Sequence, residues 1–393
     1  MLFMDRIFPK SLQERWNNPK GLIQVFTGPR QVGKTTTAIK LMNPKNSVYA
    51  SADLPAPPTP AFIEENWKKA REIENKDRTL ILDEIQKIPR WSEIVKALWD
   101  EDKRNNIVMR VCLLGSSSLL IEKGLSESLT GRFEVNYFPH WTYGECHKCF
   151  GITVEDYNLV GGYPKSYDFL SDRERLDAYL QNSILEPTLG RDILALHSVD
   201  KPALLRQLFW YISRLPSQIV SYDKILGHLQ GKGNAATLVH YADLFSKAFL
   251  LKPLSKFSNR AHRTKRSIPK WIISNPGLVE TSIKKSGLTG FVFENLMGSH
   301  ILNLIFGHKE YELQFWREDN WEVDFILTQH NEPILAIEVK SGRKKKNAGI
   351  EMMKKKGILC PAIIISKDNM TDFLQTTNIE EILNLHYPNP ALA

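Results

Sequence analysis

The stretch that decides the fold is Gly21–Met42, GLIQVFTGPRQVGKTTTAIKLM. Its first part, LIQVFT, is a run of mostly apolar residues that predicts a short strand. Its last part, KTTTAIKLM, has helical character. Between them Gly28, Gly33, Lys34 and Thr35 follow the spacing G-x-x-x-x-G-K-T. We therefore expect a strand, a tight glycine loop and a helix in direct succession.

This succession predicts a site for phosphate groups. Glycines let the backbone curl so that its N–H groups converge on phosphate oxygens, and the following helix N-terminus adds a partial positive charge. In this Walker A pattern Lys34 reaches the β- and γ-phosphates, and the Thr35 hydroxyl is a ligand of Mg²⁺. The nucleotide-binding residues that we predict are Gly28, Pro29, Arg30, Gln31, Val32, Gly33, Lys34, Thr35 and Thr36.

A second strand is predicted in RTLILDEIQ, where apolar and β-branched residues from Thr79 to Leu82 end in Asp83 and Glu84. Ligands gather at the carboxyl ends of the strands in an open α/β sheet. We therefore expect Asp83 to hold Mg²⁺ through water and Glu84 to polarise an attacking water molecule.

A third strand, MRVCLLGSSSLL, ends in small polar residues, and Ser116 is placed to sense the γ-phosphate or to orient water. The alternative is a plain strand-to-helix turn with serine caps. In SLTGRF, Arg132 follows a glycine turn. We predict that it stabilises transition-state charge, in its own chain or from a neighbouring one, against the alternative of an ordinary structural arginine.

The motifs GPRQVGKTT, LILDEIQ, LLGSS and TGRF, in this order, resemble the AAA-superfamily ATPases of the archaeal type. This resemblance extends over nearly the whole chain and implies binding and hydrolysis of ATP with Mg²⁺. It also implies that a domain of unknown function follows the ATPase domain. It does not imply a known biological task.

The middle of the chain has a helical pattern. Apolar residues recur at spacings of three and four, as in Leu204, Leu205, Leu208 and Ile212. Three such segments within residues 203–254, ending in LLKPLSKF, predict a winged-helix-like region, which the resemblance supports.

The last quarter contains a strand that combines apolar and charged residues. In AIEVKSG, Ala336–Gly342, Glu338 and Lys340 lie two residues apart and share one face of the strand. The preceding segment, 312–327, reads as a β-hairpin that carries Asp324, and a helix over 291–305 carries Glu294.

The order Asp, gap, Glu-x-Lys resembles the core of PD-(D/E)xK nucleases, although no proline precedes Asp324. The resemblance implies that Asp324 and Glu338 hold Mg²⁺ against a phosphodiester and that Lys340 orients or activates water. Glu294 matches the helix acid that completes such clusters. The alternative is an inert nuclease-like fold held by a Glu–Lys pair.

The length of 393 residues predicts two or three domains. We expect an α/β protein with a P-loop NTPase domain on a parallel sheet, a winged-helix-like region and a restriction-endonuclease-like α/β domain. The predicted boundaries are 1–150 for the AAA-type ATPase domain, 151–200 for a helical lid or linker, 201–270 for the winged-helix-like region and 271–393 for the nuclease-like domain.

The net charge is +8, and the basic residues are distributed unevenly along the sequence. Basic runs lie at Asn259–Arg266 and between Lys340 and Lys356. They predict contact with a nucleic acid, DNA before RNA, against the alternative of solvated surface. No long apolar run or apolar leader is present, and four cysteines are too few for a disulfide framework, so we expect a cytoplasmic protein without a membrane partner.

The leading hypothesis is an ATPase coupled to nucleic-acid binding or cleavage. The alternative is a nucleotide-switched regulator that binds protein partners and cuts nothing. A homo-oligomer stays open in both cases.

Overall fold

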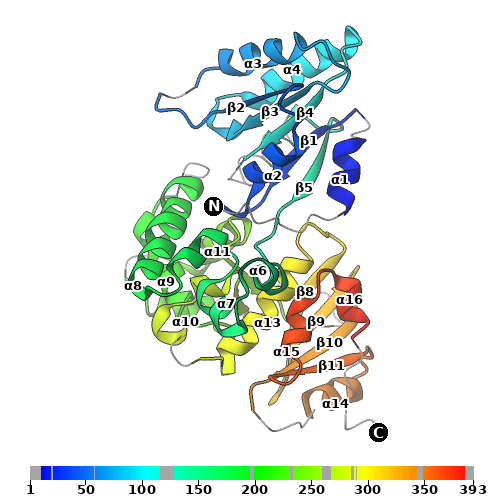
Figure 1. Ribbon diagram of the computed structural model, residues 1–393. Coiled ribbons are helices and arrows are strands. Elements are labelled where there is room, and N and C mark those ends of the chain that lie inside the picture. The colour runs from blue at the N-terminus through cyan, green and yellow to red at the C-terminus, as the bar shows by residue number, and fades with distance from the viewer. Residues whose placement is uncertain are drawn as a thin grey trace. The chain divides into compact units, whose positions relative to one another are not determined.

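The computed structural model describes residues 10–18, 21–56, 58–115, 125, 128–194, 199–230, 233–258, 267–284, 287–288, 290–342 and 348–385. The chain divides into two compact units, Met1–Pro139 and His140–Ala393 (Figure 1). Within the described part of the chain, no helix combines the length and apolar character that a membrane crossing requires.

The N-terminal unit is built on a five-stranded parallel sheet in the order β2-β3-β4-β1-β5 (Figure 1). Residues of β1, β3 and β4 are buried almost throughout, because their apolar runs lie in the middle of the sheet. The predicted P-loop type of α/β sheet is thus confirmed. Its strands are β1 (Ile23–Thr27), β2 (Ser47–Ser51), β3 (Thr79–Asp83), β4 (Arg110–Leu114) and β5 (Phe133–Tyr137).

Helices α3 and α4 are joined to each other through a buried acid. Asp102 is 2% exposed, and its carboxylate accepts hydrogen bonds from Trp67 Nε1 at 2.8 Å and from Arg71 Nε at 2.7 Å. Both oxygens of this buried carboxylate therefore have partners. The helices of the unit are α1 (Lys10–Asn17), α2 (Lys34–Leu41), α3 (Ala61–Arg71) and α4 (Trp91–Arg104).

The first part of the C-terminal unit is helical, as the spacing of apolar residues predicts. Its helices are α6 (Tyr143–Phe150), α7 (Val154–Val160), α8 (Arg173–Tyr179), α9 (Pro202–Ile212), α10 (Tyr222–Leu226) and α11 (Ala235–Lys247), with π-helical segments at Leu180–Leu185 and Thr188–Ile193. After α11 the chain forms an antiparallel pair, β6 (Leu251–Leu254) and β7 (Lys270–Ile273). The winged-helix-like character of this region stays a prediction.

The second part of the same unit contains a four-stranded sheet in the order β11-β10-β9-β8 (Figure 1). The predicted hairpin is the antiparallel pair of β8 and β9, and β10 pairs antiparallel with β9 and parallel with β11. Helix α13 contacts both β10 and β7. The restriction-endonuclease-like identity stays a prediction. The elements are α12 (Thr281–Lys284), α13 (Gly290–Leu304), β8 (Tyr311–Glu318), β9 (Trp321–Gln329), β10 (Glu332–Lys340), α14 (Ala348–Lys355), β11 (Ala362–Ser366), α15 (Met370–Gln375) and α16 (Ile379–Leu383).

The turn after α7 can only be built with glycine. Gly161 has φ 73° and ψ −164°, and a Cβ there would lie 1.6 Å from Asn275 Oδ1. Gly151, at the end of α6, also has a positive φ, 68°, but has no atom within 4 Å of the Cβ position. Substitution of Gly151 therefore tests the effect of backbone strain alone, whereas substitution of Gly161 tests backbone strain together with a steric overlap.

We expect Gly161→Ala to destabilise the protein clearly more than Gly151→Ala, whose left-handed strain alone costs about 1 to 2 kcal/mol. The additional loss comes from the overlap with Asn275 and from a backbone region that is nearly exclusive to glycine. Urea unfolding of both variants measures the difference, and equal losses would show that the contact at Asn275 is not tight.

Candidate functional site

The glycine loop lies between β1 and α2, as the sequence predicts. Gly28 has φ 152°, and a Cβ there would lie 2.0 Å from the carbonyl oxygen of Phe138, so a side chain cannot be accommodated. Lys34 is the first residue of α2, and its ammonium donates to the carbonyl oxygens of Gly28 at 2.9 Å and Pro29 at 2.6 Å. The lysine thus folds back over the loop that is predicted to enclose phosphates.

The helix that follows the loop is joined to the end of β3 by a hydrogen bond. Thr35 Oγ1 donates to Asp83 Oδ2 at 2.7 Å, and Tyr49 Oη donates to the same oxygen at 3.0 Å. Burial, with the Asp83 charge as the second cause, raises the pKa of Tyr49 to about 12. The phenol therefore stays a hydrogen-bond donor to Asp83 at neutral pH. A hydroxyl and a carboxylate in direct contact are the ligand types that Mg²⁺ takes in nucleotide sites, so the residues present fit that ion.

Glu84 follows in a constrained backbone conformation. Its φ is 53°, a left-handed value that is uncommon for a residue other than glycine. Its amide donates to Asp83 Oδ1 at 2.8 Å, and its side-chain Oε2 accepts from Gln86 Nε2 at 2.7 Å. The turn thereby places two acids side by side at the carboxyl edge of the sheet, where the sequence predicts them.

Two further residues, Ser116 and Arg132, are predicted to act in catalysis at this site. Ser116 lies outside the described residues, although β4, which leads to it, does lie between β1 and β3. Arg132 forms a two-pronged ion pair with Asp100 on α4, with N–O distances of 2.8 and 3.1 Å. The structure therefore does not bring Arg132 to the loop, and its role in transition-state stabilisation stays a prediction.

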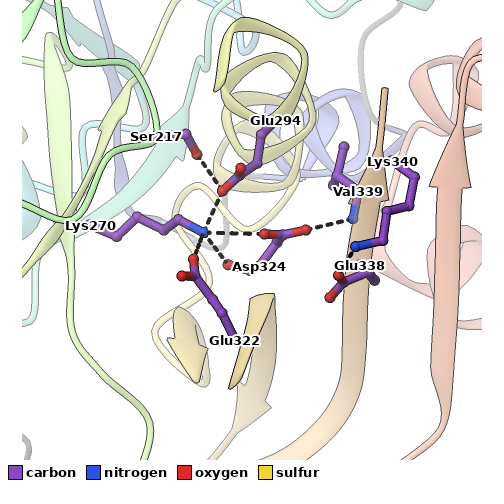
Figure 2. Close-up of polar contacts among 8 residues, drawn as sticks. All are labelled: Ser217, Lys270, Glu294, Glu322, Asp324, Glu338, Val339 and Lys340. Atoms are coloured by element: carbon purple, nitrogen blue, oxygen red, sulfur yellow. Dashed lines mark hydrogen bonds and ion pairs between the residues drawn. The ribbon is translucent and has the colours of Figure 1, made fainter. Parts of the chain in front are cut away.

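A second cluster of charged side chains lies in the C-terminal unit (Figure 2). Asp324 on β9 accepts a hydrogen bond at Oδ2 from the backbone N–H of Val339 on β10, at 2.7 Å. Glu338 accepts from the Lys340 ammonium through Oε1. Its other oxygen, Oε2, is buried and has no hydrogen-bond partner among the described residues. Glu338 as a whole is 6% exposed, so bulk solvent has little access to this carboxylate.

Two residues of this cluster are absent from the sequence-based prediction. Lys270 on β7 is 1% exposed and makes ion pairs with Glu294, with Glu322 at 3.0 Å and with Asp324 at 3.6 Å (Figure 2). Among the described residues, one group of three candidate metal ligands is found, and it consists of Glu294, Glu322 and Asp324. Their oxygens lie within 4.8 Å of one another, while Glu338 is not part of this group.

The cluster holds more negative than positive charge. Four carboxyl groups face the ammonium groups of Lys270 and Lys340, which leaves a formal charge of −2 when all six are ionised. Burial, followed by the charge of Asp324, raises the pKa of Glu294 to about 8 and that of Glu338 to about 7. Burial acts to lower the pKa of Lys270, but the surrounding carboxylates outweigh it and the pKa is raised.

Residues 20–147 match the family model described as an AAA domain. The glycine loop and all five strands of the parallel sheet lie within this match. Two further models match residues 152–289 and 289–384, and both are described as domains of unknown function, DUF8612 and DUF4143. No curated protein matches the chain.

Several solved structures are similar to the chain at low identity. They include the Walker-type ATPase paby2304 of Pyrococcus abyssi (14% identity, 70% of this chain and 95% of that chain, TM-score 0.45). Others are Aeropyrum pernix ORC1 in complex with DNA (11%, 74% and 96%, TM-score 0.31) and AMPPCP-bound DnaA from Aquifex aeolicus (16%, 62% and 93%, TM-score 0.31). At these scores the likeness carries no inference about function.

The charge excess predicts a pH dependence of stability. Glu294 and Glu338 hold protons in the folded state at pH values where a carboxyl group of the unfolded chain, with a pKa of about 4.3, has lost them. The folded state then binds more protons, so the unfolding free energy falls as pH rises. Between pH 6.5 and 8 the opposite slope from the buried His300, whose pKa burial lowers to about 3, fades as the imidazole of the unfolded chain, with a pKa of about 6.5, loses its proton.

We therefore expect the unfolding free energy to fall between about pH 6.5 and 8 in the wild type and to fall less in Glu294→Gln, which has no carboxyl proton to lose at this position. Urea unfolding at several pH values measures both slopes. Glu332→Gln, at an exposed position on β10, is the control and keeps the wild-type slope. A Glu294→Gln slope equal to that of the wild type would contradict the assignment.

Proposed function

We propose that the chain binds ATP with Mg²⁺ at the AAA domain and hydrolyses it. The observation that carries this proposal is the 2.7 Å hydrogen bond between Thr35 Oγ1 and Asp83 Oδ2, which joins the helix after the glycine loop to the end of β3. It is supported by the match of residues 20–147 to an AAA domain model.

In this proposal Thr35 directly, and Asp83 through water, would hold Mg²⁺, which would supply positive charge against the charge that develops on the phosphates. Lys34 releases the carbonyl oxygens of Gly28 and Pro29 and turns its ammonium to the terminal phosphates. Glu84 accepts a proton from, or orients, the attacking water. It is positioned for this by the Asp83 carboxylate at its amide and by Gln86 at its side chain.

We expect Lys34→Ala to lower the rate of ATP hydrolysis by about 100-fold or more, because it removes a preorganised positive charge from the phosphates. Lys40→Ala, an exposed lysine in the last turn of the same helix, is the matched control and keeps the wild-type rate. Release of phosphate with Mg²⁺ and ATP measures both. Equal rates for the wild type and Lys34→Ala would place hydrolysis elsewhere or exclude it.

A second function is favoured by one specific observation in the C-terminal unit. Glu338 Oε2 is buried and has no hydrogen-bond partner in the described part of the chain, and the backbone N–H of Val339 links its strand to Asp324 on the next one. We propose that Asp324 and Glu338 hold a divalent ion there and that Lys340 orients or activates water for cleavage of a phosphodiester in DNA or RNA, as the PD-(D/E)xK resemblance implies. Glu294 matches the helix acid of such clusters, but its carboxylate is paired with Lys270.

The substrate side of this proposal is supported by charge alone. The basic run Asn259–Arg266 and residues 343–347 of the run after Lys340 lie outside the described residues, so only their sequence supports the proposal. The rival function is a nucleotide-switched regulator with an inert nuclease-like fold, in which Glu338 and Lys340 are a structural pair.

We expect plasmid cleavage with Mg²⁺ and ATP that is lost in Lys340→Ala, because that change removes the ammonium beside the scissile phosphate. Lys356→Ala, whose side chain pairs with Glu318 at the surface, is the control. Cleavage that Lys340→Ala leaves unchanged would place the chemistry elsewhere. A folded wild type that cuts neither DNA nor RNA would favour the regulator.

A further inference from the structure

The three acids Glu294, Glu322 and Asp324 have the ligand chemistry of a divalent-cation site. Their oxygens lie within 4.8 Å of one another, and carboxylate oxygens are the ligands that Mg²⁺ and Ca²⁺ prefer. All three side chains are partly or largely buried, with exposures of 12%, 33% and 14%. Several carboxylates this close together need a positive charge between them.

That charge is already present as the ammonium of Lys270 (Figure 2). An ammonium has three N–H donors and no acceptor. Lys270 Nζ finds an acceptor for each, in a Glu294 carboxylate oxygen, in Glu322 Oε1 at 3.0 Å and in the backbone carbonyl of Asp324 at 3.2 Å. The side chain is 1% exposed, so these donors have protein acceptors in place of water.

Two aromatic rings next to the Lys270 ammonium also favour an ammonium group at this position. Lys270 Nζ lies over the ring of Phe325, 5.2 Å from its centroid, and 5.8 Å from the centroid of Phe315. Aromatic faces attract ammonium groups electrostatically. They offer no oxygen to Mg²⁺, which requires about six oxygen ligands in near-octahedral geometry. A divalent ion therefore does not fit between these acids while Lys270 is in place.

Lys270 is held at this position by the backbone on both sides. Its strand pairs with β6, where Lys270 faces Leu254, and on the other side Lys270 forms an antiparallel bridge with Ile219. From this second neighbour Ser217 Oγ donates to Glu294 Oε1 at 2.9 Å. A lysine on a strand that is paired along both edges cannot swing out of the cluster as one on a loop could.

The cation and the acids come from different parts of the chain. Lys270 and Ser217 lie in the segment 152–289, whereas all three acids lie in the segment 289–384. Without the earlier segment, the later one would contain three close carboxylates with no lysine between them.

We propose that Lys270 is the resident cation of the Glu294–Glu322–Asp324 cluster, supplied by the preceding segment in place of a divalent metal. No metal ion then lies among the three acids in the intact protein, so the divalent ion proposed above would be held by Asp324 and Glu338 without Glu294. Replacing Lys270 by a neutral side chain of similar length turns the cluster into a divalent-cation site, because three carboxylates are left without a counter-charge. The proposal is independent of ATP hydrolysis.

The test measures Mn²⁺ binding in full-length protein without nucleotide, by electron paramagnetic resonance and by the shift in thermal unfolding. All proteins carry Glu338→Gln, which removes the carboxylate of the neighbouring metal site proposed above. We expect Lys270→Met in this background to bind one further Mn²⁺ per chain and to be stabilised by it, relative to the background protein.

Lys284→Met in the same background is the matched control. Lys284 is also buried, at 4% exposure, but it donates to the carbonyl oxygens of Leu159 at 3.0 Å and Gly277 at 2.9 Å. Its loss destabilises the unit without creating a site, so no additional Mn²⁺ is expected.

Any of three results would overturn the proposal. The first is that the background protein binds Mn²⁺ and that Glu322→Gln abolishes this binding, which would show a metal beside Lys270. The second is that Lys270→Met folds but binds no additional Mn²⁺. The third is that Lys270→Met fails to fold and Mn²⁺ does not restore folding, which would show that a divalent ion cannot replace the ammonium.

Discussion

The hydrogen bond between Thr35 and Asp83 is the contact on which the account of the N-terminal unit depends. Thr35 lies after β1 and Asp83 is the last residue of β3, and these two strands are separated by β4. Since all pairings in this sheet are parallel, the strands end at the same edge, and a loop after one can meet an acid at the end of another. Tyr49 adds a second donor to the same oxygen and fixes the carboxylate further. The glycine loop and the acid are thus positioned by the sheet before any ligand binds.

The C-terminal unit handles charge in a different way. Its acids lie on a helix and two strands that converge, and burial makes their mutual repulsion costly. Two lysines offset part of that charge, and the pKa values of Glu294 and Glu338 are raised first by burial and second by the charge of Asp324. In the N-terminal unit Asp83 is equally buried, at 6% exposure, but its carboxylate accepts from two hydroxyl groups and a backbone amide. Among the described residues, the first acid is thus held by neutral donors and the second cluster by lysines.

The sequence predicts best what is encoded locally. The loop from Gly28 to Thr35 is contiguous, and its strand–loop–helix context can be identified without knowing the fold. The strands that carry Asp324 and Glu338 are equally visible, because charged residues interrupt apolar alternation. Glu322 lies two residues before Asp324 on the same strand, so the same reasoning about strand faces could have found it.

Lys270 and Tyr49 could not be assigned in this way, since the partners of each lie on other strands or a helix. A lysine at the start of the apolar run KWII was a usable signal of a buried charge, but nothing local identifies its three acids. The engagement of Arg132 by Asp100 is likewise a tertiary contact between α4 and the segment before β5. Contacts between residues that are distant in sequence can be assigned only from the three-dimensional structure.

The most direct test of the central claim is calorimetric titration of the full-length protein with ATP, in the presence and absence of Mg²⁺. The account predicts saturable binding that Mg²⁺ strengthens, and loss of the Mg²⁺ effect in Asp83→Asn, because the metal contact is removed while the glycine loop stays intact. Absence of ATP binding at saturating nucleotide and Mg²⁺, or an undiminished Mg²⁺ effect in Asp83→Asn, would contradict it.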